Sequence, residues 1–161
     1  MVECGKIFKF KLIKGVEMRK PIVAGNWKMH KTVSEAEELV KILKSDIEKI
    51  FSVESVFCVP FTALIKVSYL LSESRICLGV QNIHWEKQGA YTGEISPLMV
   101  KEFANYAIIG HSERRAYFGE TDEYVNKRVI AALENNIVPI VCVGETLDEN
   151  KQGITSEVIE R

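Results

Sequence analysis

The chain has 161 residues, of which 47% are hydrophobic and 27% charged, and its formal net charge is -1. These values fit one compact globular domain and exclude an intrinsically disordered chain. A strongly basic nucleic-acid-binding surface is also excluded as a global feature, and no apolar run is long enough to span a bilayer. We therefore expect a cytoplasmic protein with neither nucleic acid nor membrane as a partner.

Residues 1–18 do not share the pattern of the rest of the chain. Phe8–Leu12 alternates apolar and basic side chains, which fits an edge strand and a disordered segment equally well. Met18 offers an alternative start. We interpret residues 1–18 as an N-terminal extension, disordered or not native, and residues 19–161 as the domain proper.

From Pro21 onward, short apolar segments alternate with amphipathic ones. Five segments rich in Val and Ile are predicted as strands: 21–27, 55–59, 76–80, 106–110 and 137–144. The intervening helices are predicted from position 34 to about 50, over 62–74, from position 97, over 121–136, and from position 155 to the end. Residues 144–153 are predicted to form a loop.

Local capping signals support the predicted helices. Ser34 and Glu37 match a capping box, in which each side chain bonds the other residue's amide. Ser96 precedes Pro97, which suits the first position of a helix. Thr121 is predicted to cap a helix whose inward face carries four apolar side chains: Val125, Val129, Ala132 and Leu133.

The strands are continuously apolar, so both faces of the sheet must be covered, as in parallel sheets built from right-handed crossovers. Two architectures fit this α/β pattern: an open doubly wound sheet, or part of a closed (β/α)8 barrel. Neither G-x-G-x-x-G after the first strand nor G-x-x-x-x-G-K-[ST] is present, which disfavours nucleotide-binding folds.

Polar residues follow the strands directly, and the carboxyl ends of parallel strands are where such folds bind ligands. Lys28 suits an anionic substrate, because an ammonium about 4 Å from an anion gains roughly 4 kcal/mol at an effective dielectric of about 20. The other polar side chains at strand ends include Asn26, Gln81, Asn82, His111 and Glu145.

His111 directly follows the apolar strand and Gly110. If residues 112–114 begin a helical turn, the positive end of that turn favours a neutral imidazole, which can donate a hydrogen bond to a carbonyl oxygen. A Ser–His hydrolase is disfavoured, because Ser112 is adjacent to His111 and the motif is G-H-S-E-R rather than G-x-S-x-G. The cysteines and histidines lack zinc-site spacing, so no metal is expected.

Four segments, in this order, resemble the triosephosphate isomerase family: AGNWKMHKT (24–32), GVQNIHWEKQGAYTGEIS (79–96), IIGHSERRAYFGET (108–121) and PIVCVGETLDE (139–149). The resemblance runs from about Arg19 to Arg161. It implies interconversion of dihydroxyacetone phosphate and glyceraldehyde 3-phosphate in glycolysis and gluconeogenesis, no cofactor, and a homodimer.

The resemblance also implies roles for individual residues. Asn26 and Lys28 would contact the substrate, and His111 would act at its carbonyl as a neutral electrophile, a feature known of this family. Ser112 and Glu113 would support that site, and Thr92 would reach the partner subunit.

The family barrel has eight strands in about 250 residues. Five strands are predicted here, so we expect an incomplete (β/α)8 TIM barrel. The family's general-base glutamate, lid and phosphate loops follow the sixth and later strands. We expect the 161-residue chain alone to be inactive and aggregation-prone. The alternative is a non-catalytic fragment or split-protein half that associates with a complementing chain.

Overall fold

The computed structural model describes residues 20–160, so the prediction for residues 1–18 lies outside the described residues. Five parallel strands form one sheet in the order β1-β2-β3-β4-β5. The strands are β1 (Ile22–Asn26), β2 (Glu54–Val59), β3 (Cys77–Val80), β4 (Tyr106–Ile109) and β5 (Val138–Val141). The helices are α1 (Val33–Ile47), α2 (Phe61–Leu70), α3 (Pro97–Lys101), α4 (Ser112–Phe118), α5 (Asp122–Glu134), α6 (Leu147–Lys151) and α7 (Thr155–Glu160).

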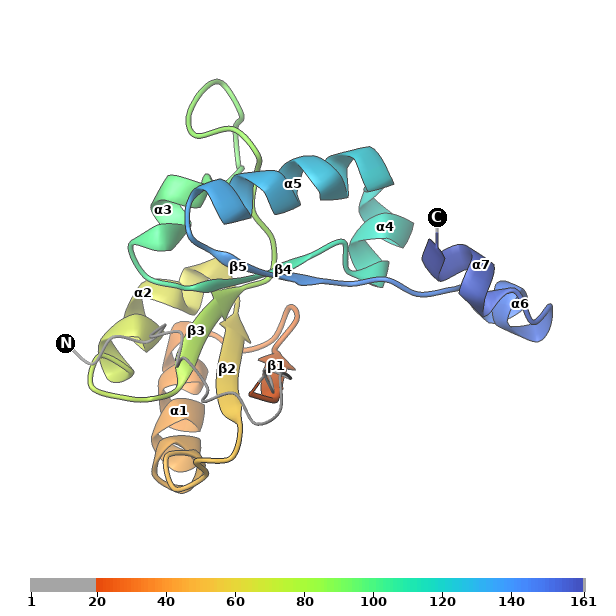
Figure 1. Ribbon diagram of the computed structural model, residues 1–161. Coiled ribbons are helices and arrows are strands. Elements are labelled where there is room, and N and C mark those ends of the chain that lie inside the picture. Colours follow the sequence, from red (N-terminus) through yellow and green to blue (C-terminus); the bar gives the residue numbers. More distant parts are fainter. Residues whose placement is uncertain (1–19, 161) are drawn as a thin grey trace, which may run out of the picture.

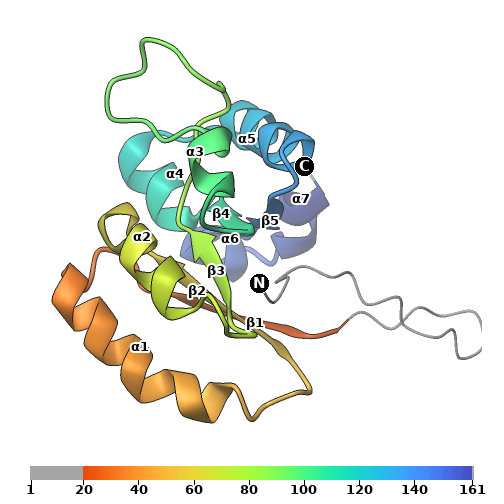
Figure 2. The same cartoon turned by 90° about the vertical axis from the view of Figure 1, so that its left-hand side faces the viewer.

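The strand order decides between the two predicted architectures. A doubly wound sheet reverses its strand order at a switch point, whereas here each strand pairs with the next one along the chain. Every crossover therefore runs in the same sense, and α1, α2 and α5 lie along one side of a curling sheet (Figures 1 and 2). The sheet is a half-barrel, which confirms the prediction of an incomplete TIM barrel.

Alternating side chains of the strands fill two apolar layers. Phe57, Val59 and Val80 face the helices in the larger cluster, while Val56 and Cys58 lie in a smaller cluster on the concave face. The central strands β2, β3 and β4 are almost wholly buried. This explains why their sequences are continuously apolar rather than alternating.

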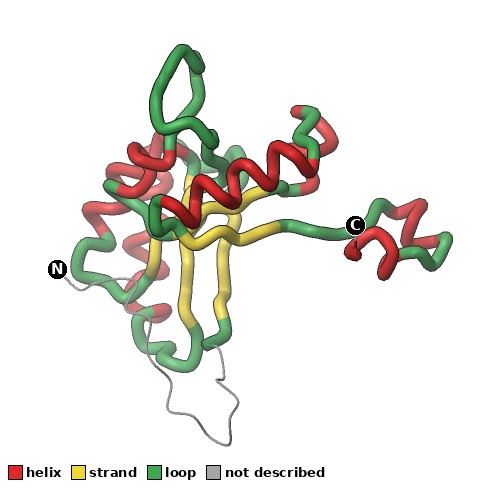
Figure 3. The backbone as a smooth tube through the Cα atoms, turned by 45° about the horizontal axis from the view of Figure 1, so that its top comes forward, coloured by secondary structure: helices red, strands yellow, loops and turns green. Residues whose placement is uncertain are grey.

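The two outer strands differ from the central ones. Val23 of β1 is 59% exposed and Val138 of β5 is 45% exposed, although both are strand residues with apolar side chains. Beyond β5 the chain continues into α6 and α7, which project away from the sheet (Figures 1 and 3). Among residues 20–160, β1 and β5 each pair with a strand on one side only and expose apolar side chains, a geometry that favours pairing with further strands.

Several predicted helix boundaries are confirmed. Ser96 caps α3 with Pro97 at its first position, Thr121 caps α5, and α7 begins at Thr155. The loop predicted for 144–153 is wrong over Leu147–Lys151, where a capping box of Thr146 and Glu149 opens α6.

The capping box of α1 lies two residues earlier than predicted. Thr32 caps α1, and its box partner is Glu35 rather than Glu37. Glu37 instead binds Lys41 and Lys66 through its two carboxylate oxygens, at 2.8 and 2.9 Å.

The inward face of α5 is also rotated from the prediction. Val125 and Ala132 are buried as expected, but Leu133 is 59% exposed. Arg128 takes the inward position instead, with Nη1 2.8 Å from Oε1 of the buried Glu120. A paired charge thus lies on the buried face of α5, at a position outside the predicted apolar set.

Candidate functional site

A pocket of about 360 Å³ opens at the carboxyl ends of the strands. Its polar lining includes residues that follow β1, β3 and β4: Asn26, Lys28, Gln81, Asn82, His111 and Glu113. Apolar side chains complete the wall, including Phe61, Ile83, Ile95 and Phe118. The polar residues that follow β1, β3 and β4 therefore converge, with Lys28 and His111 in the same pocket, whereas Glu145 after β5 does not line it.

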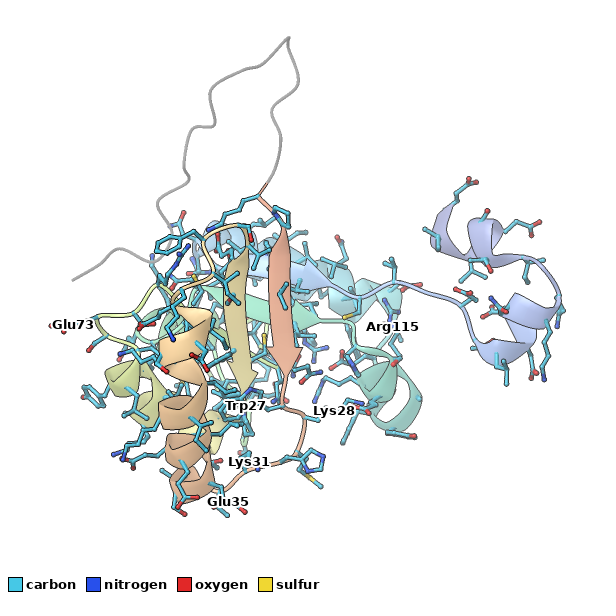
Figure 4. All side chains as sticks on the ribbon, turned by 90° about the horizontal axis from the view of Figure 1, so that it is seen from below. Trp27, Lys28, Lys31, Glu35, Glu73 and Arg115 are labelled. Carbon is cyan, nitrogen blue, oxygen red and sulfur yellow. The ribbon has the colours of Figure 1, made fainter. Side chains whose placement is uncertain are left out.

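Lys28 is held in an unusual backbone conformation. It follows β1 after Trp27, and its φ of 53° places it in the left-handed region that non-glycine residues seldom occupy. The Oδ1 atom of Asn26 accepts the Lys28 backbone N–H at 3.0 Å. Figure 4 shows Lys28 beyond the tip of β1, on the side of α4. Strained backbone of this kind is concentrated at functional sites.

The Lys28 side chain is joined to α4. Its Nζ lies 2.7 Å from Oε1 of Glu113, which belongs to the first turn of α4. The hydrogen bond from Lys28 holds the pKa of the Glu113 carboxyl below its usual value, and the positive charge of Lys28 adds to this effect. Glu113 is therefore a paired anion, with little capacity to accept a proton at neutral pH.

His111 caps α4 with its imidazole. The ring atom Nδ1 accepts the Glu113 backbone N–H at 3.3 Å, while the Glu113 carboxylate oxygen Oε2 lies 3.6 Å from the same nitrogen. An acceptor nitrogen carries no proton, so this bond assigns the ring proton of the neutral tautomer to Nε2. The ring lines the pocket, and a protonated Nε2 is a hydrogen-bond donor suited to a carbonyl oxygen.

Gln81 was noted only as a polar residue after a strand, yet it connects three strand ends. Its Nε2 donates to the backbone oxygens of Lys28, at 2.9 Å, and of Cys58, at 3.0 Å. Its position directly after β3 is the sequence feature that indicates a place at the strand ends. The sequence does not show its bonded partners, which are 53 and 23 positions away.

The remaining residues singled out in the sequence lie outside the pocket lining. Ser112 is the exposed first residue of α4, and Thr92 is exposed in the loop before α3, where its neighbour Gly93 lines the pocket. Glu145 accepts hydrogen bonds from Asn150, at 2.7 Å, and from Thr155, at 3.1 Å, and so ties α6 to α7.

Within residues 20–160 no group of three or more His, Cys, Asp or Glu side chains is arranged to hold a metal ion. Helices long and apolar enough to cross a bilayer are likewise not found in the same range.

Comparison with known proteins decides the family. Residues 21–161 match the family model described as triosephosphate isomerase. The chain belongs to the triosephosphate isomerase family. Both the resemblance of the sequence motifs and the half-barrel fold are thereby explained.

Individual relatives agree with this assignment. The chain is 53% identical over 143 residues to triosephosphate isomerase of Dehalococcoides mccartyi, covering 89% of this chain and 56% of the relative. It is 54% identical over 143 residues to that of Thermoanaerobacter pseudethanolicus, covering 88% and 57% respectively. The crystal structure of triosephosphate isomerase from Bartonella henselae superposes with a TM-score of 0.83 at 41% identity, covering 89% of this chain and 60% of that one. The chain thus spans less than two thirds of the length of these relatives.

Proposed function

We propose that this chain supplies the N-terminal part of a triosephosphate isomerase that interconverts dihydroxyacetone phosphate and glyceraldehyde 3-phosphate. The observation that supports this most directly is the convergence of Lys28 and His111 on one pocket from the ends of β1 and β4. An ammonium and a ring N–H donor are the two groups that a small phosphorylated carbonyl compound requires for binding and polarisation.

The reaction moves one proton between adjacent carbons, while the neighbouring oxygens exchange carbonyl and hydroxyl character. In the proposal Lys28 attracts the anionic substrate, Asn26 contacts it, and Nε2–H of His111 donates to the carbonyl oxygen as negative charge develops there. Glu113 and Ser112 support the site by orienting Lys28 and beginning α4.

The base that takes the proton must be another group. Glu113 is unsuited, because its carboxylate is paired with Lys28 and its pKa is lowered. By family resemblance the base is a glutamate that follows the sixth strand, and β5 is the last strand among the described residues. We therefore propose that the 161 residues alone do not catalyse the reaction at an enzymatic rate, since positioned acid–base catalysis contributes about 10²–10⁴-fold.

The second candidate is a split-protein half that associates with a complementing chain, and the exposed edges β1 and β5 favour it. In the complete barrel we propose a cytoplasmic homodimer with Thr92 contacting the partner subunit, since Thr92 lies exposed in the loop before α3.

Co-expression tests both candidates. The chain is produced with the part of the Dehalococcoides mccartyi relative that lies beyond the matched region, and triose phosphate interconversion is assayed. Activity in the mixture but in neither part alone supports the proposal, and the Lys28→Met variant should remove it. A soluble complex without activity supports the second candidate, a non-catalytic fragment that associates with a complementing chain. Normal activity of the 161-residue chain alone would contradict the proposed dependence on a second segment.

A further inference from the structure

We propose that Gln81 is a positioning residue that fixes Lys28 in its working place through the Lys28 backbone. Its importance for the reaction rests on the function proposed above, whereas its action on Lys28 does not. The carboxamide of Gln81 is placed where the tips of β1, β2 and β3 meet.

The regular strand pairing ends just before Lys28. The Trp27 N–H still bonds the backbone oxygen of Cys58, at 3.0 Å, but both backbone polar atoms of Lys28 bond to side chains. The N–H is bound by Asn26 and the C=O by Gln81. Asn26 is the last residue of β1, so its bond to Lys28 is local in the sequence. Gln81 connects the Lys28 backbone to the end of β3.

The chemistry of the contact suits an uncharged amide. Two carbonyl oxygens, of Lys28 and Cys58, accept from the same side-chain nitrogen, and the two N–H bonds of a carboxamide supply one donor to each. A carboxylate would place an acceptor against two acceptors, and a thioether would leave both oxygens without this donor. The identity of the residue at position 81 therefore controls the backbone of Lys28.

The consequence reaches the pocket through a short series of contacts. Gln81 holds the left-handed backbone of Lys28, and Nζ of Lys28 reaches Glu113 from that position. The Glu113 N–H in turn bonds Nδ1 of His111. Release of the Lys28 backbone would loosen the ammonium from Glu113 and from its place at the rim of the pocket.

Competitive acetylation of lysines, read by peptide mass spectrometry at micromolar protein concentration, measures how accessible the Lys28 ammonium is. The full 161-residue chain is treated with limiting acetic anhydride, and labelling of Lys28 is normalised to the exposed Lys87 and Lys101. In Gln81→Met, which keeps side-chain length and loses both donors, relative labelling of Lys28 should rise about two- to fivefold. Glu113→Gln sets the value for a broken ion pair, and Gln88→Met is the matched change at an exposed loop position.

Lys44, whose Nζ bonds the backbone oxygen of Leu70 at 3.0 Å, reports general loosening of the fold. A rise at Lys28 with Lys44 unchanged supports the proposal. Unchanged labelling of Lys28 in Gln81→Met overturns it. If labelling of Lys44 rises as well, the Gln81→Asn variant decides between the two explanations. Its shorter amide side chain cannot reach the backbone oxygens of both Lys28 and Cys58. Raised Lys28 labelling in Gln81→Asn at wild-type Lys44 labelling then supports the proposal, and any other result overturns it.

A second readout applies to the complemented enzyme. Displacement of the Lys28 ammonium should raise KM for the anionic substrate more than it lowers kcat, whereas simple destabilisation would lower the amount of active enzyme and leave KM unchanged. If the complemented wild type is inactive, the proposed function fails, and the labelling experiment still decides whether Gln81 positions Lys28.

Discussion

The Nζ atom of Lys28 lies 2.7 Å from Oε1 of Glu113, which joins the end of β1 to the first turn of α4. The two residues are 85 positions apart in the sequence, and their side chains remain 49% and 42% exposed. This ion pair places a cation at the rim of the pocket and keeps its partner ionised.

The first prediction concerns the pH dependence of this pair. The pKa of Glu113 is lower in the folded chain than its ordinary value, chiefly through the hydrogen bond from Lys28. Its contribution to stability is therefore complete above the unfolded-state pKa of about 4.3 and is lost as the pH falls through the lower folded value. The difference in unfolding free energy between wild type and Glu113→Gln should be constant near neutrality and shrink below about pH 4.3.

Urea titrations at several pH values measure this difference. The control is the same substitution in a Lys28→Met background, where the partner that lowers the pKa is missing and the pH-dependent difference should largely vanish. An equal pH dependence in both backgrounds would show that Lys28 is not its cause.

The second prediction concerns close packing over β3. A Cβ added at Gly79 would lie 2.8 Å from Sγ of Cys58 and 3.1 Å from Cβ of Tyr106, in the small cluster on the concave face. Gly79→Ala should therefore destabilise the fold by about 1–3 kcal/mol. Gly25→Ala in β1 is the control, because its nearest neighbour is the Val56 oxygen at 3.9 Å. Urea unfolding of both variants gives the comparison, and equal costs would contradict the packing argument.

Local chemistry in the sequence was sufficient for much of the fold. The apolar strands, the Ser96–Pro97 start of α3 and the Thr121 cap of α5 depend on neighbouring residues only, and the structure has them where they were predicted. The capping box of α1 was ambiguous, because Thr32–Glu35 and Ser34–Glu37 satisfy the same pattern. The choice between them follows from ion pairs of Glu37 with Lys41 and Lys66, the second of which lies on α2.

The parts that sequence reasoning missed depend on distant contacts. The α6 helix has a capping box but too few apolar side chains for helical periodicity, so the sequence pattern predicts a loop there. Apolar periodicity favours Leu133 over the charged Arg128 as an inward residue, and that pattern does not show the ion pair with Glu120 that accompanies the burial of Arg128. For the pocket, the polar residues at strand ends were identified, whereas the contact of Gln81 with the Lys28 backbone required the folded sheet.

The third prediction concerns the thiol of Cys58. Burial raises its pKa to about 12, and the nearby Cys142 adds to the shift. Because only the thiolate is nucleophilic, alkylation of Cys58 by iodoacetamide at pH 8 should be slower by roughly three orders of magnitude than in the urea-unfolded chain. Peptide mass spectrometry over time measures the two rates. Rapid labelling of Cys58 under native conditions would show that the concave face opens readily.

The last prediction separates the two roles of His111, which caps α4 and lines the pocket. Asparagine is a good N-cap residue, so His111→Asn should preserve the capping of the Glu113 N–H while removing the imidazole. His111→Ala removes both the cap of the Glu113 N–H and the imidazole, and should cost about 0.5–2 kcal/mol of stability. In the complemented enzyme, both variants should lose about 10²–10³-fold in kcat, since both lack the ring donor.

Urea unfolding and isomerase assays on the same two proteins distinguish the roles. A stability near wild type for His111→Asn, together with the loss in kcat, assigns the imidazole to the reaction independently of the cap. If His111→Asn retained full activity, the capping bond rather than the ring would be what the site requires. His30→Asn is the control, because His30 follows β1 rather than β4, is exposed and is absent from the lining of this pocket.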